Sequence, residues 1–133
     1  MNRAEIDGIT LEYEVQGSGE PVFFIHGALM GDTYRPLMVE PALKDYRFIG
    51  YHRRGYASSS PLDGPLPISG HAADCLGLLQ ELNAVPAHLV GHSSGAVIAL
   101  QLALDAPEAV RSLTLLEPAL LDVPSGAALF EAF

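Results

Sequence analysis

Short, largely apolar runs alternate with helix-type patterns along most of this chain. The runs cover residues 22–25, 46–51, 88–90 and 112–116, and helical patterns separate them at residues 33–43, 72–82 and 94–104. Pro41 predicts an early end of the first of these helices. A continuous apolar run of this length is typical of a strand buried on both faces of a sheet. Parallel strands are joined by right-handed crossovers. The order therefore predicts an α/β fold with a mostly parallel sheet and helices on both faces.

An antiparallel hairpin is predicted before the parallel strands. Apolar and polar side chains alternate over residues 9–15, which is the period of a half-buried strand. Asp7-Gly8, just before this stretch, is a turn pair that tolerates positive φ angles. Residues 52–69 are rich in Ser, Gly and Pro, which predicts a long loop before the next helix.

Composition excludes several classes of protein. The 133 residues are 49% hydrophobic and 17% charged, which is too apolar for a disordered chain. A net charge of −9 offers no basic surface to nucleic acid, so we expect no nucleic-acid partner. Cys75 is the single cysteine, and no His, Asp or Glu cluster has the spacing of metal ligands, so we expect no metal and no other cofactor. No leader-like or membrane-spanning stretch is evident, and we expect a cytoplasmic protein without a membrane partner.

The segment Gly91-His92-Ser93-Ser94-Gly95 fits the pattern G-x-S-x-G. It lies where the strand at 88–90 ends and the apolar helix at 94–104 begins, and a serine on such a sharp turn exposes its hydroxyl above the sheet. The free N–H groups at the start of the helix favour a negatively charged oxygen beside that hydroxyl. We therefore predict that Ser93 is a nucleophile. The alternative is that Ser93 only caps the helix.

A second motif, His26-Gly27-Ala28, follows the apolar run at 22–25. A loop at the end of the strand before the first parallel crossover can offer another backbone N–H group to the same oxygen. We expect His26 to brace this loop through hydrogen bonds rather than to transfer protons.

Together with residues 51–59, these motifs resemble the α/β-hydrolase fold superfamily over residues 5–120. Residues 51–59 are similar to the superfamily pattern D-x-R-G-x-G-x-S, with matches at Arg54, Gly55 and Ser59 and departures at His52 and Ala57. The resemblance implies that residues 1–119 are the N-terminal half of the hydrolase core. It also implies that residues 120–133 are the start of a cap region or a C-terminal tail.

The resemblance assigns roles within the two loops. It implies that the backbone N–H groups of Ala28 and Ser94 form an oxyanion hole beside Ser93. The motif residues that would support this arrangement are His26, Gly27, Gly91, His92 and Gly95.

The residues for proton transfer are harder to place, because the superfamily order is serine, then Asp or Glu, then His. All five histidines precede Ser93, namely His26, His52, His71, His88 and His92. Glu117 follows the strand at 112–116, at the strand end where catalytic groups gather, and is the candidate acid. The alternative for Glu117 is a solvated turn carboxylate or a helix N-cap partner. His52 is the candidate for a substitute base, and we expect His71 and His88 to be exposed.

The resemblance implies a serine hydrolase that acts through Ser93 on an ester or another acyl-type bond of a small-molecule substrate. The site is incomplete here, because no triad histidine follows the nucleophile, and we expect a chain truncated before the superfamily's acid and histidine. The strand at 112–116 would then be an unpaired edge. We therefore expect a homodimer or a complementing chain at that edge.

Other functions fit the same pattern. The chain is alternatively a non-catalytic truncated remnant or interaction module of the same fold, and a haloperoxidase-like perhydrolase would use the same serine. Dehalogenases and epoxide hydrolases are disfavoured, because they need a carboxylate at position 93. A nucleotide-binding Rossmann domain is disfavoured too, because no G-x-G-x-x-G follows the first strand.

Overall fold

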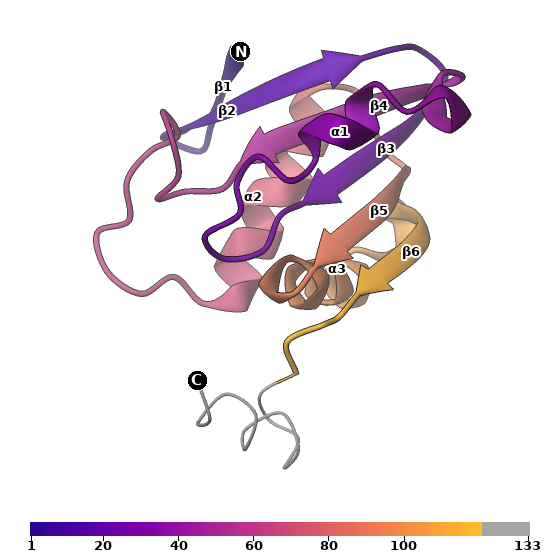
Figure 1. Cartoon of the computed structure of the whole chain (residues 1–133). Helices are drawn as coiled ribbons and strands as arrows, with labels where there is room; N and C mark the ends of the chain where they lie inside the picture. The colour runs from indigo at the N-terminus through magenta and orange to yellow at the C-terminus, as the bar shows by residue number, and fades with distance from the viewer. Residues whose placement is uncertain (121–133) are drawn as a thin grey trace.

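The computed structural model describes residues 1–120, which form a six-stranded sheet with helices on both faces (Figure 1). The strands are β1 (Asn2–Ile6), β2 (Ile9–Gln16), β3 (Glu20–Ile25), β4 (Tyr46–His52), β5 (Ala87–His92) and β6 (Val110–Leu116). Their order across the sheet is β1-β2-β4-β3-β5-β6. The pairs β1–β2 and β2–β4 are antiparallel, and the remaining pairs are parallel. The predicted N-terminal hairpin and mostly parallel sheet are therefore confirmed.

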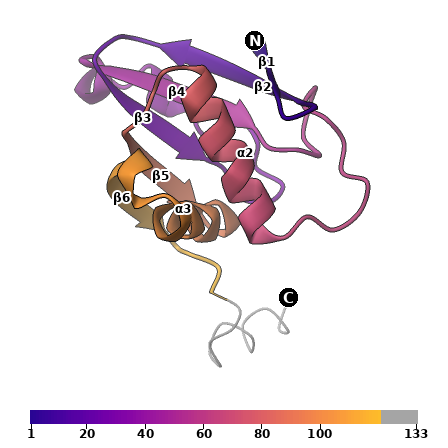
Figure 2. The same cartoon turned by 180° about the vertical axis from the view of Figure 1, so that it is seen from behind.

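Helices cover the sheet unequally. The long helices α2 (Ile68–Glu81) and α3 (Ser94–Asp105) lie against one face, as the view from behind shows (Figure 2). The short α1 (Arg35–Met38) lies on the opposite face, in front of β3 and β4 in Figure 1. The 3-10 helices η1 (Pro41–Leu43) and η2 (Pro107–Ala109) complete the regular elements of the described residues.

Two apolar clusters, one on each face of the sheet, explain why the central strands are continuous apolar runs in the sequence. On β3, Phe23 and Ile25 point into the large cluster under α2 and α3, while Val22 and Phe24 join a smaller cluster on the α1 face. All four side chains are buried, so neither face of this strand tolerates a polar residue. The two clusters fix the sheet from both sides and hold the strand ends that carry the loops described below.

The helix predicted at 33–43 is shorter than that range, and it ends before Pro41, as expected from that proline. The structure has the four-residue α1, then an extended Glu40, then the separate turn η1 that begins at Pro41. Proline lacks the N–H group that a continuing helix needs, and it disfavours helical backbone in the residue before it. The segment is instead anchored by Tyr34, whose fully buried ring fills the space above Gly50 of β4.

Strand β6 lies at one edge of the sheet, and within residues 1–120 its only neighbour is β5. Six of its seven residues are exposed, among them Leu113, Leu115 and Leu116. The edge predicted for this strand is thus present in the described part of the chain. Beyond residue 120, the predicted cap region or tail lies outside the described residues, and the division into residues 1–119 and 120–133 stays a prediction. Among the described helices, none is both long and apolar enough to cross a membrane.

Candidate active site

Ser93 lies on the sharp turn between β5 and α3 and has an unusual backbone conformation. Its φ and ψ angles are 54° and −120°, a region that residues with a side chain rarely adopt. The end of β6 holds this turn, because the Ser93 N–H donates to the carbonyl oxygen of Leu116 at 2.9 Å. Ser93 itself is half-buried at the carboxyl end of the sheet. A strained, externally held serine at this point matches the predicted strand–turn–helix context.

The two flanking glycines are required by close backbone contacts. A Cβ atom on Gly91 would lie 2.5 Å from the carbonyl oxygen of Gly95. A Cβ atom on Gly95 would collide with the carbonyl oxygen of Ile25 and lie 2.6 Å from that of His26. The start of α3 therefore packs directly on the end of β3, which brings the turn at Ser93 against the loop that follows β3.

The loop His26-Gly27-Ala28 lies on the turn at Ser93. A Cβ atom on Gly27 would be 3.1 Å from the His92 carbonyl oxygen and 3.2 Å from the Ser93 Cβ. Neither the Ala28 N–H nor the Ser94 N–H is used in a hydrogen bond between residues of the described chain. The structure thus brings two free backbone donors to the region of the Ser93 side chain, one from the loop and one from the start of a twelve-residue helix.

His26 is fully buried and has both ring nitrogens engaged. Its Nδ1 lies 2.7 Å from the carbonyl oxygen of Gly27, and its Nε2 accepts the backbone N–H of Arg53 at 3.1 Å. The carbonyl can only accept and the N–H can only donate, so the proton is on Nδ1 and the ring is neutral. Burial lowers the pKa of His26 to about 4, which is consistent with that neutral form. This geometry agrees with the bracing role predicted for His26.

His52 is held between two carboxylates. Its Nδ1 lies 3.1 Å from Glu12 Oε2, and its Nε2 lies 2.9 Å from Asp32 Oδ1. Hydrogen bonds from Arg35 and His52 hold the pKa of Asp32 below its usual range. Because both ring nitrogens are occupied, His52 has none left to accept a proton from Ser93, and this speaks against its role as a substitute base. No sequence signal pointed to these two partners, which lie 40 and 20 residues away.

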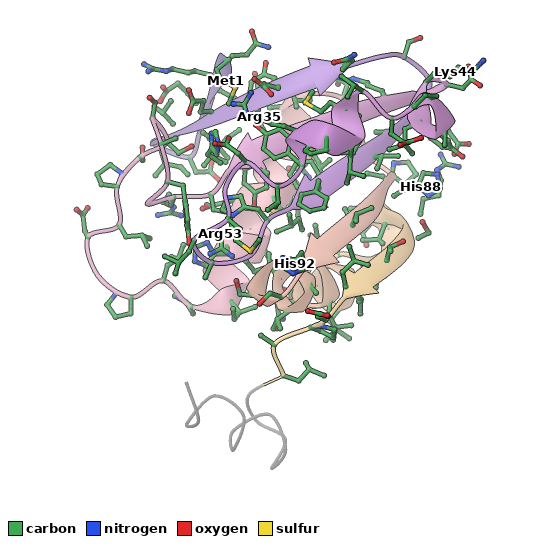
Figure 3. All side chains as sticks on the ribbon, in the orientation of Figure 1. Met1, Arg35, Lys44, Arg53, His88 and His92 are labelled. Carbon is green, nitrogen blue, oxygen red and sulfur yellow. The ribbon has the colours of Figure 1, made fainter. Side chains whose placement is uncertain are left out.

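The remaining histidines do not supply a base either. His88 lies at the opposite end of β5 from His92 (Figure 3), where its ring nitrogens contact Ser112 and Glu20. His71 was expected to be exposed, but it is buried in the first turn of α2, and this expectation is wrong. His92 is half-buried beside the nucleophile turn. Within residues 1–120, no hydrogen bond joins a histidine to the Ser93 hydroxyl.

Glu117 directly follows β6 and therefore lies next to the residue that bonds the Ser93 N–H. Its backbone is in the left-handed region, with φ 47°, and its side chain is exposed. No ion pair joins Glu117 to another residue of the described chain. Its assignment as the catalytic acid stays a prediction. The described residues contain no cluster of three or more His, Cys, Asp or Glu side chains that could hold a metal ion.

Comparison with known proteins agrees with this architecture. The sequence model of the alpha/beta hydrolase fold family matches residues 20–133. The hydrolase YraK of Bacillus subtilis, itself uncharacterised, is 33% identical over 132 residues, which are 96% of this chain and 48% of YraK. The solved structure of a thermophilic esterase from Thermogutta terrifontis superposes with a TM-score of 0.84 at 27% identity, over 94% of this chain and 49% of the esterase.

A further solved structure is that of BpoC from Mycobacterium tuberculosis H37Rv, which carries the name of a non-heme bromoperoxidase. It superposes with a TM-score of 0.79 at 34% identity, over 92% of this chain and 46% of BpoC. The chain thus spans about half the length of each of these three proteins. The family match covers most of the chain and includes both loops of the candidate site. This chain belongs to the alpha/beta hydrolase fold family.

Proposed function

We propose that this chain carries the nucleophile and the oxyanion donors of a serine hydrolase that acts on an ester or another acyl-type bond. The Ser93 hydroxyl attacks the carbonyl carbon, and the resulting negatively charged oxygen accepts hydrogen bonds from the Ala28 and Ser94 N–H groups. Collapse of this intermediate releases the leaving group and leaves an acyl group on Ser93. Water then hydrolyses the acyl-enzyme by the same two steps.

The observation that carries this proposal is the conformation of Ser93 together with its surroundings. A helix cap needs no left-handed backbone, whereas a nucleophile raised above the sheet does. The Ser93 side chain also makes no capping hydrogen bond to the start of α3. The similarity to an esterase and to a protein named a hydrolase supports a hydrolytic reaction.

The proposal assigns proton transfer to a histidine outside residues 1–133. A serine hydroxyl needs an adjacent base at neutral pH. The 40 residues after Ser93 contain no histidine, and two of the earlier ones, His26 and His52, have both ring nitrogens engaged. Glu117 is the proposed acid that would orient such a base, because it follows the strand next to the nucleophile turn.

Phosphonylation in the presence of imidazole tests the proposal on the chain itself. Imidazole in solution replaces the missing base, so a fluorophosphonate probe should modify Ser93 at a rate that rises with imidazole concentration. Mass spectrometry locates the modified residue. Ser93→Ala should abolish the modification, and Ser18→Ala, at an exposed turn, should leave it unchanged. If Ser93 stays unmodified at every imidazole concentration, the hydrolase proposal fails and a non-catalytic module of the same fold is favoured.

A perhydrolase is the second candidate, supported by the similarity to BpoC. Both functions use the same serine, so phosphonylation does not separate them. The distinction is which nucleophile, water or hydrogen peroxide, accepts the acyl group from Ser93. Acyl transfer to peroxide that outpaces hydrolysis, measured as peracid formation from a p-nitrophenyl ester, would favour the perhydrolase.

A further inference from the structure

Arg53 joins the two loops of the candidate site. It follows β4 directly, and its Nη1 donates to the His26 carbonyl oxygen at 3.3 Å and to the Ser94 hydroxyl at 3.1 Å. Its backbone N–H donates to His26 Nε2 at 3.1 Å. Figure 3 shows Arg53 at the same end of the sheet as His92. One residue therefore bonds both the loop that carries Ala28 and the first residue of α3.

The charge of Arg53 has no counter-charge in the described part of the chain. The residue is 7% exposed, and no carboxylate of residues 1–120 forms an ion pair with it. Its Nε atom is buried without a hydrogen-bond partner among residues 1–120, and its guanidinium lies 5.3 Å from the centre of the Tyr56 ring. A buried cation without an anionic partner is unfavourable for folding. Its presence beside the nucleophile turn therefore points to a role other than stability.

The neighbouring Arg54 lies in the same loop but is paired with a carboxylate. Arg54 forms two parallel hydrogen bonds to Asp74 of α2, at 2.8 and 2.7 Å, and within residues 1–120 its side chain forms no hydrogen bond to either loop of the site. This bidentate pair ties the loop after β4 to the helix layer. The two adjacent arginines thus have separate partners, which makes Arg54 a matched control for Arg53.

The loop after β4 holds the Ala28 loop at further points. The Leu29 N–H donates to the Tyr56 hydroxyl at 3.1 Å, and the rings of His26 and Tyr56 contact edge to face at 4.6 Å between centroids. These contacts fix the Ala28 loop only to the loop after β4. Among the side-chain hydrogen bonds of the described chain, only those of Arg53 connect the Ala28 loop to α3 as well.

We propose that Arg53 is a positioning residue that sets the separation of the Ala28 and Ser94 N–H groups, an inference that rests on the proposed function of these groups. Oxyanion donors act only when they lie about 2.7–3.1 Å from the charged oxygen. Gly27 already contacts the Ser93 turn closely, so a change at Arg53 shifts the loop relative to the turn rather than being absorbed by free space. Arg53 itself touches neither Ser93 nor the substrate in this role.

The test compares Arg53→Met with Arg54→Met in the imidazole-assisted phosphonylation of Ser93. Loss of one oxyanion donor typically lowers the rate about 100-fold or more, so we expect Arg53→Met to slow modification by at least about tenfold. Arg54→Met should stay within about twofold of the unmodified chain, on the same basis. An unchanged rate in Arg53→Met would overturn the proposal, as would an equal loss in both variants.

Chemical rescue separates positioning from general damage to the fold. In Arg53→Ala, added guanidinium should restore the rate of Ser93 modification, and tetramethylammonium should not, because it cannot donate hydrogen bonds. Rescue by both cations, or by neither, would contradict a hydrogen-bonding role. Arg53→Lys keeps the charge but cannot reach both acceptors with the same planar geometry, and we expect it to remain slow. Full activity of Arg53→Lys would show that charge alone suffices.

A second readout keeps this inference separate from the proposed function. In Arg53→Met, the backbone amide resonances of Ala28 and Ser94 should shift together in a nitrogen–proton correlation spectrum, whereas in Arg54→Met they should not. If the unmodified chain shows no labelling of Ser93, the hydrolase proposal fails, and the amide resonances alone decide whether Arg53 positions the two donors. Unmoved resonances would then overturn the positioning role.

Discussion

Acidification should destabilise this fold through His26 in a defined pH window. The ring is neutral in the folded chain, and burial lowers its pKa to about 4, while an unfolded histidine titrates near 6.5. Between these values the unfolded chain binds one more proton than the folded chain, so stability rises with pH across the window and is lost on acidification. The slope is about 1.4 kcal/mol per pH unit, and the total loss from pH 7 to pH 4 is about 3 kcal/mol.

Urea denaturation across this range, with His26→Gln as the reference, isolates the contribution of His26. A glutamine offers both a donor and an acceptor but does not titrate. Carboxylates with a lowered pKa, such as Asp32, also weaken the fold at low pH, but they do so in both proteins and cancel in the difference. The difference in free energy of unfolding should therefore shrink by about 3 kcal/mol from pH 7 to pH 4.

Two results would refute this reasoning. One is a difference between the two proteins that does not vary with pH. The other needs no variant: a His26 ring resonance of the unmodified chain that titrates near 6.5 would show that the ring is not held neutral by burial and by the bond from Arg53.

Three further changes probe other parts of the fold. Gly95→Ala should destabilise the chain by about 3 kcal/mol or more in urea denaturation, because its Cβ meets the carbonyl oxygen of Ile25. His52→Asp introduces the residue that the superfamily pattern has at this position. It should lower the free energy of unfolding by about 3–5 kcal/mol in the same assay, because it places a third carboxylate beside those of Glu12 and Asp32. Leu113→Lys on the exposed edge strand should reduce self-association in sedimentation velocity experiments. An equal degree of association in both proteins would contradict an apolar edge contact.

Local patterns were sufficient to predict the sheet and the nucleophile turn. The alternation at residues 9–15 corresponds to β2, and the short apolar runs correspond to β3, β4, β5 and β6. Gly91 is required within the turn itself, because its Cβ would strike the carbonyl oxygen of Gly95. The clash at Gly95 is with Ile25 at the end of β3, so this glycine was found through the motif and not through a local steric argument. At residues 33–43 the apolar spacing overestimated the helix, and Pro41 was the signal for its early end. The buried Tyr34 that anchors this segment had no sequence signal.

The interactions around the site could not be predicted in the same way. Arg53 contacts residues 27 and 41 positions away, and His52 contacts residues 20 and 40 positions away. No periodicity links such partners, because they meet only after the sheet has formed. The departure from the superfamily pattern at His52 marked an unusual position, but it did not identify Glu12 or Asp32 as its partners.

Positioning and proton transfer are separable in reactions of serine nucleophiles. When triad residues are removed from serine proteases, a rate enhancement of about 10³–10⁴ over water remains, because the oxyanion donors and binding contacts persist. In this chain the groups proposed for positioning are all within residues 1–120 and are joined through His26 and Arg53. Neither His26 nor Arg53 transfers a proton in the proposed reaction. A base added in solution should therefore accelerate modification of Ser93 in proportion to its concentration, with no preceding conformational step. A sigmoidal or lagged dependence on imidazole would show instead that the two loops are brought together only when a base is bound.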